Sequence, residues 1–190
     1  MPQPNHVSKL GVPDPDGLDG DLKALFDKCV EKLGFVPNVF KTYSLRPAKL
    51  RNFVAMYNEL MLAPSGLSKL EREMVAVAVS SANRCYYCLV AHGQAVRHLS
   101  GDPVLGEMIA LNYRVAPLDR RQRAMLDFAW KLTVTPHLVD DADRDGLRSA
   151  GLAEADIFDL AETAAFFNLS NRMASATDMM PNAEYHRLDR

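Results

Sequence analysis

Two of the three cysteines in the sequence, Cys85 and Cys88, lie one helical turn apart, and His92 follows one turn further on. A Cys-x-x-Cys pair can cycle between a dithiol and a disulfide, and the start of a helix can lower the pKa of a thiol. A histidine nearby can accept or relay a proton near neutral pH. The segment therefore predicts redox chemistry at a thiol pair.

The geometry of a helix decides which histidine belongs to the pair. On a helix over residues 85–99, Cys85, Cys88 and His92 fall on one stripe, whereas His98 falls well away from it. Cys88 and His92 are i, i+4 neighbours, so their side chains can meet. His92 is therefore the candidate proton carrier.

Two glutamates precede the cysteines, and either could help to form a thiolate as a general base. Glu71 is the third residue of a capping box that begins at Ser68, so its carboxylate has a structural use. Glu73 has no such use and begins the apolar part of the same helix. We therefore favour Glu73, with a solvated carboxylate in the first turn as the alternative.

These side chains need a scaffold, and the pattern along the chain indicates helices almost throughout. Residues 1–17 are rich in Pro, Asp and Gly and predict an extended arm, and residues 18–190 predict a single all-α domain. No long segment sustains a period of two, and Gly and Pro separate the periodic segments. The expected helices cover residues 19–33, 47–62, 68–82, 85–99, 102–111, 119–133, 140–149 and 153–176.

The helix that begins after Ser68 continues as residues 74–79, which are apolar on every side, so we expect it to be buried all round. Its capping box, Ser68 with Glu71, matches a second one, Asp119 with Gln122. The match suggests a duplicated helical unit whose second copy lacks the cysteines.

The composition limits the class of protein. Of 190 residues, 48% are hydrophobic, which is enough for a buried core. The net charge of −2 comes from 22 basic and 24 acidic residues without a basic patch, so nucleic acid is not an expected partner. The polar start lacks the apolar core of a signal peptide, and the longest strongly apolar run is too short to span a membrane.

These features predict a cytoplasmic location. In that reducing compartment a Cys-x-x-Cys pair is more often redox-active or metal-binding than structural. The third thiol, Cys29, is expected to be buried without a chemical role. It lies on an apolar stripe of the first helix, formed by Leu22, Leu25, Phe26, Cys29, Val30 and Leu33.

Glu73, eleven intervening residues, and then Cys85, Cys88 and His92 resemble the signature of the AhpD-like alkylhydroperoxidases, which belong to the carboxymuconolactone decarboxylase superfamily. The resemblance spans roughly residues 20–186 and points to the branch of peroxidase-related enzymes. It includes the segments Phe35-Val36-Pro37-Asn38-Val39-Phe40, Ser65-Gly66-Leu67-Ser68 and Phe167-Asn168-Leu169-Ser170-Asn171-Arg172.

The resemblance implies an all-helical fold that assembles into dimers, trimers or hexamers, and thiol peroxidase activity. It implies a proton relay of Glu73, His92 and Cys88, with Cys85 as the resolving cysteine. The expected partners are a hydroperoxide and a dithiol reductant, such as a lipoyl group or a thioredoxin-like protein. Nothing in the sequence implies haem, flavin or nicotinamide, and no membrane partner is expected.

The order of the two cysteines follows from their places on the helix. Cys88 lies one turn from His92, so it should attack the peroxide and become a sulfenic acid. Cys85, at the helix start, should reach solvent, condense with that sulfenic acid and then meet the reductant. The reverse order stays open, because the first cysteine is the nucleophile in many Cys-x-x-Cys proteins.

The sequence departs from the family at one position. The best-understood members carry a histidine just before the second cysteine, where this chain has Tyr87, a poor base at neutral pH. The completeness of the relay and the identity of the substrate are therefore open. Members without cysteines act on lactones, and the intact pair argues against that chemistry.

Two alternatives remain. One is a zinc-binding or structural module in which Cys85, Cys88 and His92 are joined by Glu73 or His98, although zinc sites usually draw their ligand pairs from two segments. The other is a non-redox enzyme, similar to carboxymuconolactone decarboxylase, on the same scaffold.

Overall fold

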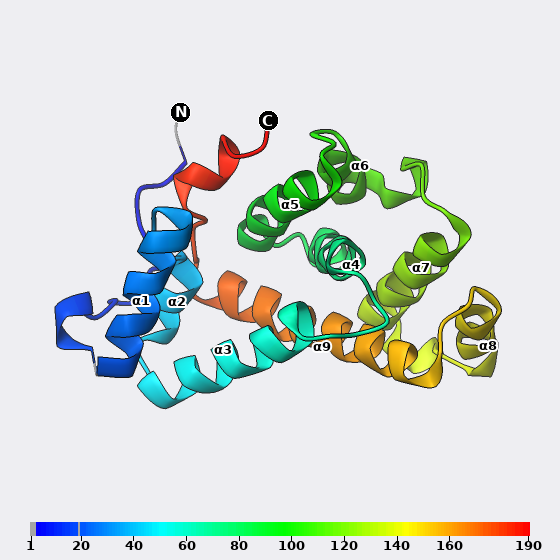
Figure 1. Ribbon diagram of the computed structural model, residues 1–190, viewed down its shortest axis with the longest axis horizontal. Helices are drawn as coiled ribbons and strands as arrows, with labels where there is room; N and C mark the ends of the chain where they lie inside the picture. Colours follow the sequence, from blue (N-terminus) through cyan, green and yellow to red (C-terminus); the bar gives the residue numbers. More distant parts are fainter. Residues whose placement is uncertain (1–2, 19) are drawn as a thin grey trace.

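The chain is all-α, as the sequence predicts (Figure 1). The computed structural model describes residues 3–18 and 20–190, and this part contains no strand. Residues 1, 2 and 19, which belong to the expected arm and the expected start of the first helix, lie outside it. The helices are α1 (Gly20–Leu33), α2 (Asn38–Tyr43), α3 (Pro47–Leu62), α4 (Lys69–Ala82), α5 (Tyr86–Ser100), α6 (Leu105–Asn112), α7 (Arg120–Val134), α8 (Asp141–Ser149) and α9 (Glu154–Ala176), with 3-10 turns at Pro15–Gly17, Tyr113–Val115, Pro136–Leu138 and Ala183–His186.

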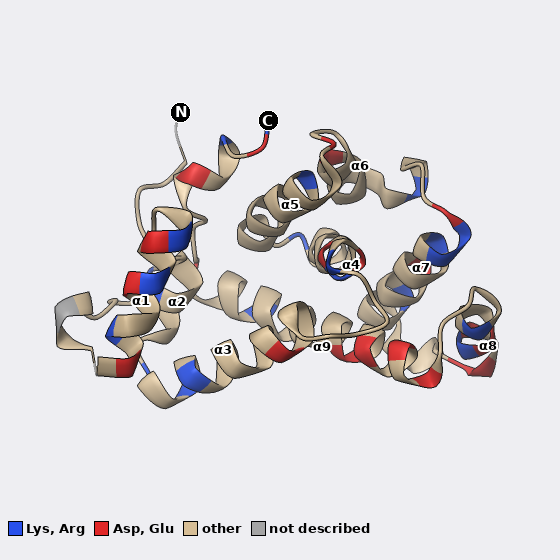
Figure 2. Cartoon of the chain, viewed as in Figure 1, with Lys and Arg blue, Asp and Glu red and all other residues tan. Residues whose placement is uncertain are grey.

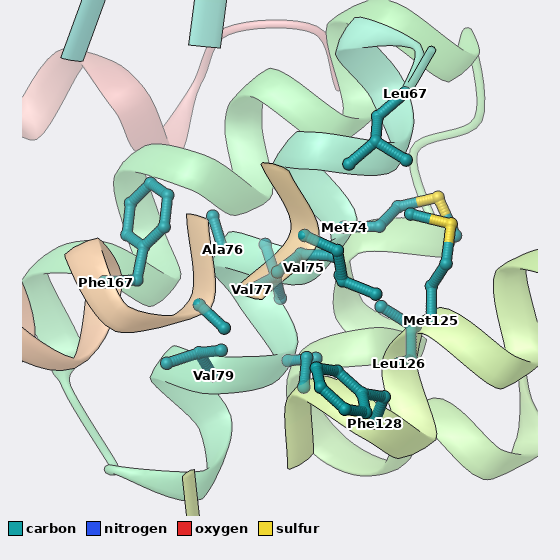
Figure 3. Packing of buried hydrophobic residues seen from close by; sticks show 14 of the residues in the cluster. Leu67, Met74, Val75, Ala76, Val77, Val79, Met125, Leu126, Phe128 and Phe167 are labelled. Atoms are coloured by element: carbon teal, nitrogen blue, oxygen red, sulfur yellow. The ribbon is translucent and has the colours of Figure 1, made fainter. Parts of the chain in front are cut away.

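Helix α4 is the centre of the core. All residues from Arg72 to Ser80 are buried, which confirms the expectation of a helix covered on every side. α5 and α6 pack against it from one direction and α7 and α9 from the other (Figure 1). Figure 3 shows its apolar side chains among those of α7 and Phe167 of α9. Glu73 is therefore buried in the protein interior, where α4 packs against α5.

Both capping boxes form. The Ser68 hydroxyl accepts the Glu71 amide at 3.1 Å, and the Glu71 carboxylate accepts the Ser68 amide at 2.7 Å. Asp119 and Gln122 exchange the equivalent bonds at the start of α7. The structure thus confirms the two helix starts, and the duplicated unit that they suggest stays a prediction.

A tight turn between α4 and α5 places the cysteines. Arg84 has a φ of 54°, in the left-handed region that residues other than glycine seldom adopt. The turn allows the Cys85 amide to donate to the Ser80 carbonyl at 2.9 Å. Cys85 becomes the N-cap of α5, so the Cys-x-x-Cys segment starts a helix beside the end of α4.

The first described residues of the chain lie beside its C-terminal segment (Figure 1). The amide of Lys9 donates to the Thr177 carbonyl at 2.9 Å, and the amide of Met180 donates to the Val7 carbonyl at 3.1 Å. The described residues of the expected arm thus bond to the C-terminal segment of their own chain. That segment runs on past α9 toward α5.

The first helix differs from its predicted stripe. Leu22, Phe26 and Cys29 are buried, as expected, whereas Val30 and Leu33 are about half exposed. Figure 2 shows acidic and basic residues interspersed along α1 and α8. In the part of the chain that is described, no helix is long and apolar enough to cross a membrane.

Candidate active site

The two cysteines of α5 are free thiols buried side by side beneath the surface. Cys85 is 2% exposed and Cys88 1% exposed, so the expectation that Cys85 reaches solvent is wrong. The reason is tertiary: Ala174 of α9 and Met179 of the C-terminal segment pack with them in one small cluster. A buried thiol pair is sheltered from adventitious reagents, and its pKa values depend on its immediate neighbours.

Those neighbours make the two thiols unequal. The Cys88 thiol donates to Cys85, and the backbone amides of Cys88 and Tyr87 point at the same sulfur. Together they outweigh burial and lower the pKa of Cys85 from its ordinary 9.0 to about 7. The hydrogen bond to Cys85, together with burial, raises the pKa of Cys88 well above 9.0. The pair therefore loses its first proton near neutral pH, and the resulting negative charge rests mainly on Cys85.

His92 and Glu73 form the second part of the site. His92 Nδ1 lies 2.6 Å from Glu73 Oε2, and both side chains are largely buried. An ionised carboxylate only accepts hydrogen bonds, so Nδ1 carries the hydrogen and Nε2 is left as the proton acceptor. The Phe167 ring packs edge-on against the imidazole at a centroid distance of 4.6 Å and limits its rotation. The imidazole is thus held in one tautomer and one orientation.

Only one of the two glutamates and one of the two histidines lie in the site, as their spacing in the sequence suggests. Glu71 stays in its capping box and also accepts from Arg121 Nε at 3.0 Å, far from the cysteines. His98 is an exposed side chain that pairs with Asp189. The candidates brought together are therefore Glu73, His92, Cys85 and Cys88.

Tyr87 replaces the family's histidine and has a structural role. Its ring is 4% exposed, and its hydroxyl accepts the backbone amide of Val39 at 3.1 Å. Burial raises the pKa of Tyr87 well above its ordinary value, so it cannot act as a base. The hydrogen bond instead fixes the first turn of α2, a short helix that sequence periodicity did not reveal.

A cavity of about 260 Å³ lies next to the His92–Glu73 pair. The residues that line it are mainly apolar and aromatic, and they include Tyr57 and Tyr185. Burial, followed by the nearby Glu73 carboxylate, raises the pKa of Tyr57, which keeps its phenol protonated. The residues that line it come from α1 to α5, α9 and the C-terminal turn: Leu33, Pro37, Val39, Phe40, Phe53, Tyr57, Glu73, Tyr87, Ala91, His92, Gln94, Ala95, Phe166, Phe167, Ser170 and Tyr185.

Helix α9 supplies residues that our sequence reasoning did not assign. Ser170 and Asn171 are buried polar side chains within hydrogen-bonding reach of the Cys88 thiol. The only signal for them was the segment from Phe167 to Arg172, noted for its resemblance to the family but given no role.

The described residues offer no ligand set for the zinc alternative. Among residues 3–18 and 20–190, no group of three or more His, Cys, Asp or Glu side chains is arranged to hold a metal ion.

The sequence and the structure were compared with known proteins. The sequence profile of the carboxymuconolactone decarboxylase family matches residues 47–104. No curated protein gives a significant match. A crystal structure described as an uncharacterized peroxidase-related protein from Silicibacter sp. TM1040 is 58% identical, with a TM-score of 0.96 over 100% of both chains.

Two further structures are similar. One, described as an alkylhydroperoxidase AhpD core and uncharacterized peroxidase-related protein from Ralstonia eutropha JMP134, is 43% identical, with a TM-score of 0.95 over 98% of each chain. The other, the debrominase Bmp8, is 20% identical, with a TM-score of 0.77 over 97% of this chain and 96% of that one, and shares the fold alone.

Proposed function

Because the chain belongs to the AhpD-like carboxymuconolactone decarboxylase superfamily, we propose that it is a thiol-dependent peroxidase that reduces hydroperoxides through Cys85 and Cys88. The observation that carries the proposal is the pairing of two inequivalent buried thiols with a carboxylate-oriented histidine, beside a cavity. In this proposal the thiol pair carries the negative charge, His92 moves the proton and the cavity holds the substrate.

Two features bear on which sulfur attacks, and they favour different cysteines. The lower pKa puts the resting thiolate on Cys85. Proximity to the cavity favours Cys88, which neighbours His92 by one helical turn and lies within reach of Ser170, both of which line the cavity. Attack requires contact with the peroxide, and His92 can remove the Cys88 proton at that moment. We therefore propose Cys88 as the residue that meets the peroxide.

In the first step His92 Nε2 takes the Cys88 proton, and the sulfur attacks one peroxide oxygen. The S–O bond forms as the O–O bond breaks, and the departing alkoxide takes the proton from His92. The products are an alcohol and a sulfenic acid on Cys88. Glu73 keeps its hydrogen bond to the imidazole throughout and stabilises its protonated form.

In the second step the Cys85 sulfur attacks the Cys88 sulfenic acid. The S–S bond forms, the S–O bond breaks and, with one proton, hydroxide leaves as water. Over both steps two thiols and one hydroperoxide become a disulfide, an alcohol and water. A dithiol reductant, a lipoyl group or a thioredoxin-like protein, then restores the thiols by exchange.

The cavity favours an organic hydroperoxide over hydrogen peroxide. Hydrogen peroxide takes roughly the space of two waters, about 60 Å³ at ~30 Å³ each, and the cavity measures about 260 Å³. The rings of Phe40, Phe53 and Phe166 form its apolar wall. Binding an apolar substituent there would remove it from water and add affinity that hydrogen peroxide cannot gain.

The test is peroxide consumption by the reduced protein with cumene hydroperoxide and with hydrogen peroxide, in the presence of a panel of dithiols. We expect turnover with cumene hydroperoxide, at the higher kcat/KM. Cys85→Ser and Cys88→Ser should abolish sustained turnover, whereas Cys29→Ser should leave it unchanged. Equal turnover by all three variants and the wild type would contradict a peroxidase that works through this pair.

The same fold also serves other reactions. A cysteine-to-alanine variant of Bmp8 was crystallised with 2,3,4-tribromopyrrole, and that protein is described as a debrominase. The panel should therefore include a lactone, because turnover of the lactone without the thiols would favour the non-redox alternative.

A further inference from the structure

The segment from Phe167 to Arg172 of α9 has a chemical use that the relay does not account for. Its inward face lies against α4 and α5, and Phe167, Ser170 and Asn171 on it are at most 7% exposed. Buried serine and asparagine are uncommon on a core-facing helix surface unless their polar groups are satisfied by partners. Phe167 packs on His92, which leaves the two polar residues to be explained.

Asn171 is held rigidly. Its amide nitrogen donates to the Ser80 hydroxyl at 3.0 Å, and its carbonyl oxygen accepts from the Asn83 side chain at 3.0 Å. Ser80 and Asn83 stand at the end of α4, where the Ser80 carbonyl also anchors the Cys85 amide. The bonds fix the Asn171 side chain at the end of α4 that carries the cysteine turn, and from there Asn171 also hydrogen-bonds to Cys88.

Ser170 is the second donor. Its side chain lines the cavity and lies within hydrogen-bonding reach of Cys88, so it is the one α9 hydroxyl that faces both the substrate space and the sulfur. A protonated thiol is a weak acceptor, and a thiolate is a strong one. Two donors aimed at one buried sulfur are therefore of most use when that sulfur is negatively charged.

We propose that Ser170 and Asn171 are catalytic donors that hold the negative charge of the Cys88 sulfur as it attacks the peroxide, an assignment that rests on the proposed peroxidase function. The donors act while the S–O bond forms and the O–O bond breaks, and their hydrogen bonds to the sulfur weaken once the neutral sulfenic acid is made. The proton follows the path through His92 given above. The donors also favour Cys88 as the thiolate that leaves when a reductant opens the disulfide at Cys85.

The charged and titratable groups around Cys88 lie on other elements. α5 contributes Cys85, Tyr87 and His92, α4 contributes Glu73 through His92, and α2 contributes Tyr43. Burial raises the pKa of Tyr43 and of Tyr87, so both stay neutral in the working range. α9 adds neutral donors only, so substitutions at Ser170 change hydrogen bonding to the sulfur without changing the charge of the site.

The test measures the pKa of Cys88 by thiolate ultraviolet absorbance in a Cys29→Ser/Cys85→Ser background, where Cys88 is the only thiol. Adding Ser170→Ala should raise the pKa by about one unit, because a hydrogen bond to a charged group is lost. Ser170→Thr, which keeps the hydroxyl, should restore it. Ser175→Ala, an exposed serine of the same helix, is the matched control and should leave the pKa unchanged.

The oxidation rate is then compared in proteins that keep both Cys85 and Cys88. At a pH below the thiol pKa, Ser170→Ala should oxidise about tenfold more slowly than the wild type, and Ser170→Thr should recover the wild-type rate. A Cys88 pKa that is the same in Ser170→Ala and in the control would overturn the proposal, even if the wild type is an active peroxidase. Conversely, a shifted pKa in a protein that consumes no peroxide would keep the donors and refute the proposed function.

Discussion

Glu73→Gln and Glu71→Gln form a matched pair of substitutions that separates a catalytic carboxylate from a structural one on the same helix. Glu73 is 7% exposed and accepts the 2.6 Å hydrogen bond from His92. Glutamine keeps the size of the side chain but removes the charge that stabilises protonated His92. A hydrogen bond to a charged group contributes about 1.5–3 kcal/mol, and each ~1.4 kcal/mol is a factor of ten in rate.

We therefore expect Glu73→Gln to slow the first oxidation by about 10²-fold, within the range for loss of general acid–base catalysis. Glu71→Gln should retain the rate, because glutamine also completes a capping box. It should lose up to about 1 kcal/mol of stability with the Arg121 ion pair.

The assay mixes each reduced variant with cumene hydroperoxide in a single turnover and counts the remaining thiols after denaturation. Thermal melting of each variant establishes that it is folded. Equal oxidation rates in the two variants would refute the assignment of Glu73, because both carry the same substitution two residues apart.

Four other outcomes follow from the site and the surface. The thiolate absorbance of the wild type should rise with a midpoint near pH 7, the pKa of Cys85, and a midpoint above 8 would contradict this. Because folding lowers this pKa from 9.0, the thiolate should contribute fully to the stability of the fold above pH 9.0, and the contribution should vanish as the pH falls through 7. Cys88→Ala should raise the midpoint by about one unit, because the S–H donor to Cys85 is lost, and Cys88→Ser should raise it by less, because serine keeps a donor. Equal shifts in the two variants would show that this hydrogen bond does not lower the pKa of Cys85. Tyr87→Phe should cost about 1 kcal/mol of stability by leaving the Val39 amide unpaired, with the oxidation rate changed by less than about threefold; a 10²-fold loss of rate would make Tyr87 part of the relay. Sedimentation at micromolar concentration should show a homo-oligomer, because Leu111 and Phe158 are 86% and 66% exposed, and a monomer would refute this.

Much of the scaffold could be predicted from local signals. Periodicity and capping residues located eight of the helices to within about three residues, because Ser68 and Asp119 carry their capping partners in the next turn. α2 was missed, since six residues are too few to show a period. It is fixed instead by distant groups, the Tyr87 hydroxyl and the side chain of Asn182.

The site divides in the same way. Spacing within a single helix was enough to select His92 over His98, and the capping box was enough to set Glu71 aside. Burial of Cys85 was not predictable, because Met179 lies over ninety residues away in sequence and covers it only in the folded chain. The lowered pKa of Cys85 likewise depends on backbone amides and on the direction of one S–H bond, which residue types alone do not encode.

The order of attack within the pair is tested by trapping the first oxidised species. In Cys85→Ser, one equivalent of cumene hydroperoxide should leave a sulfenic acid on Cys88 that a dimedone-type probe labels. In Cys88→Ser the first oxidation should be lost. Labelling of Cys85 in Cys88→Ser at the wild-type rate would reverse the two roles.

The most direct test of the central claim is mass spectrometry of the reduced protein after reaction with one equivalent of cumene hydroperoxide, with the alcohol product quantified in the same sample. The predicted result is one alcohol per protein chain and a loss of two hydrogens that maps to a Cys85–Cys88 disulfide, with Cys29 still reduced. Alcohol formed without that disulfide, or the disulfide absent while the peroxide remains unconsumed, would contradict a thiol peroxidase that works through this pair.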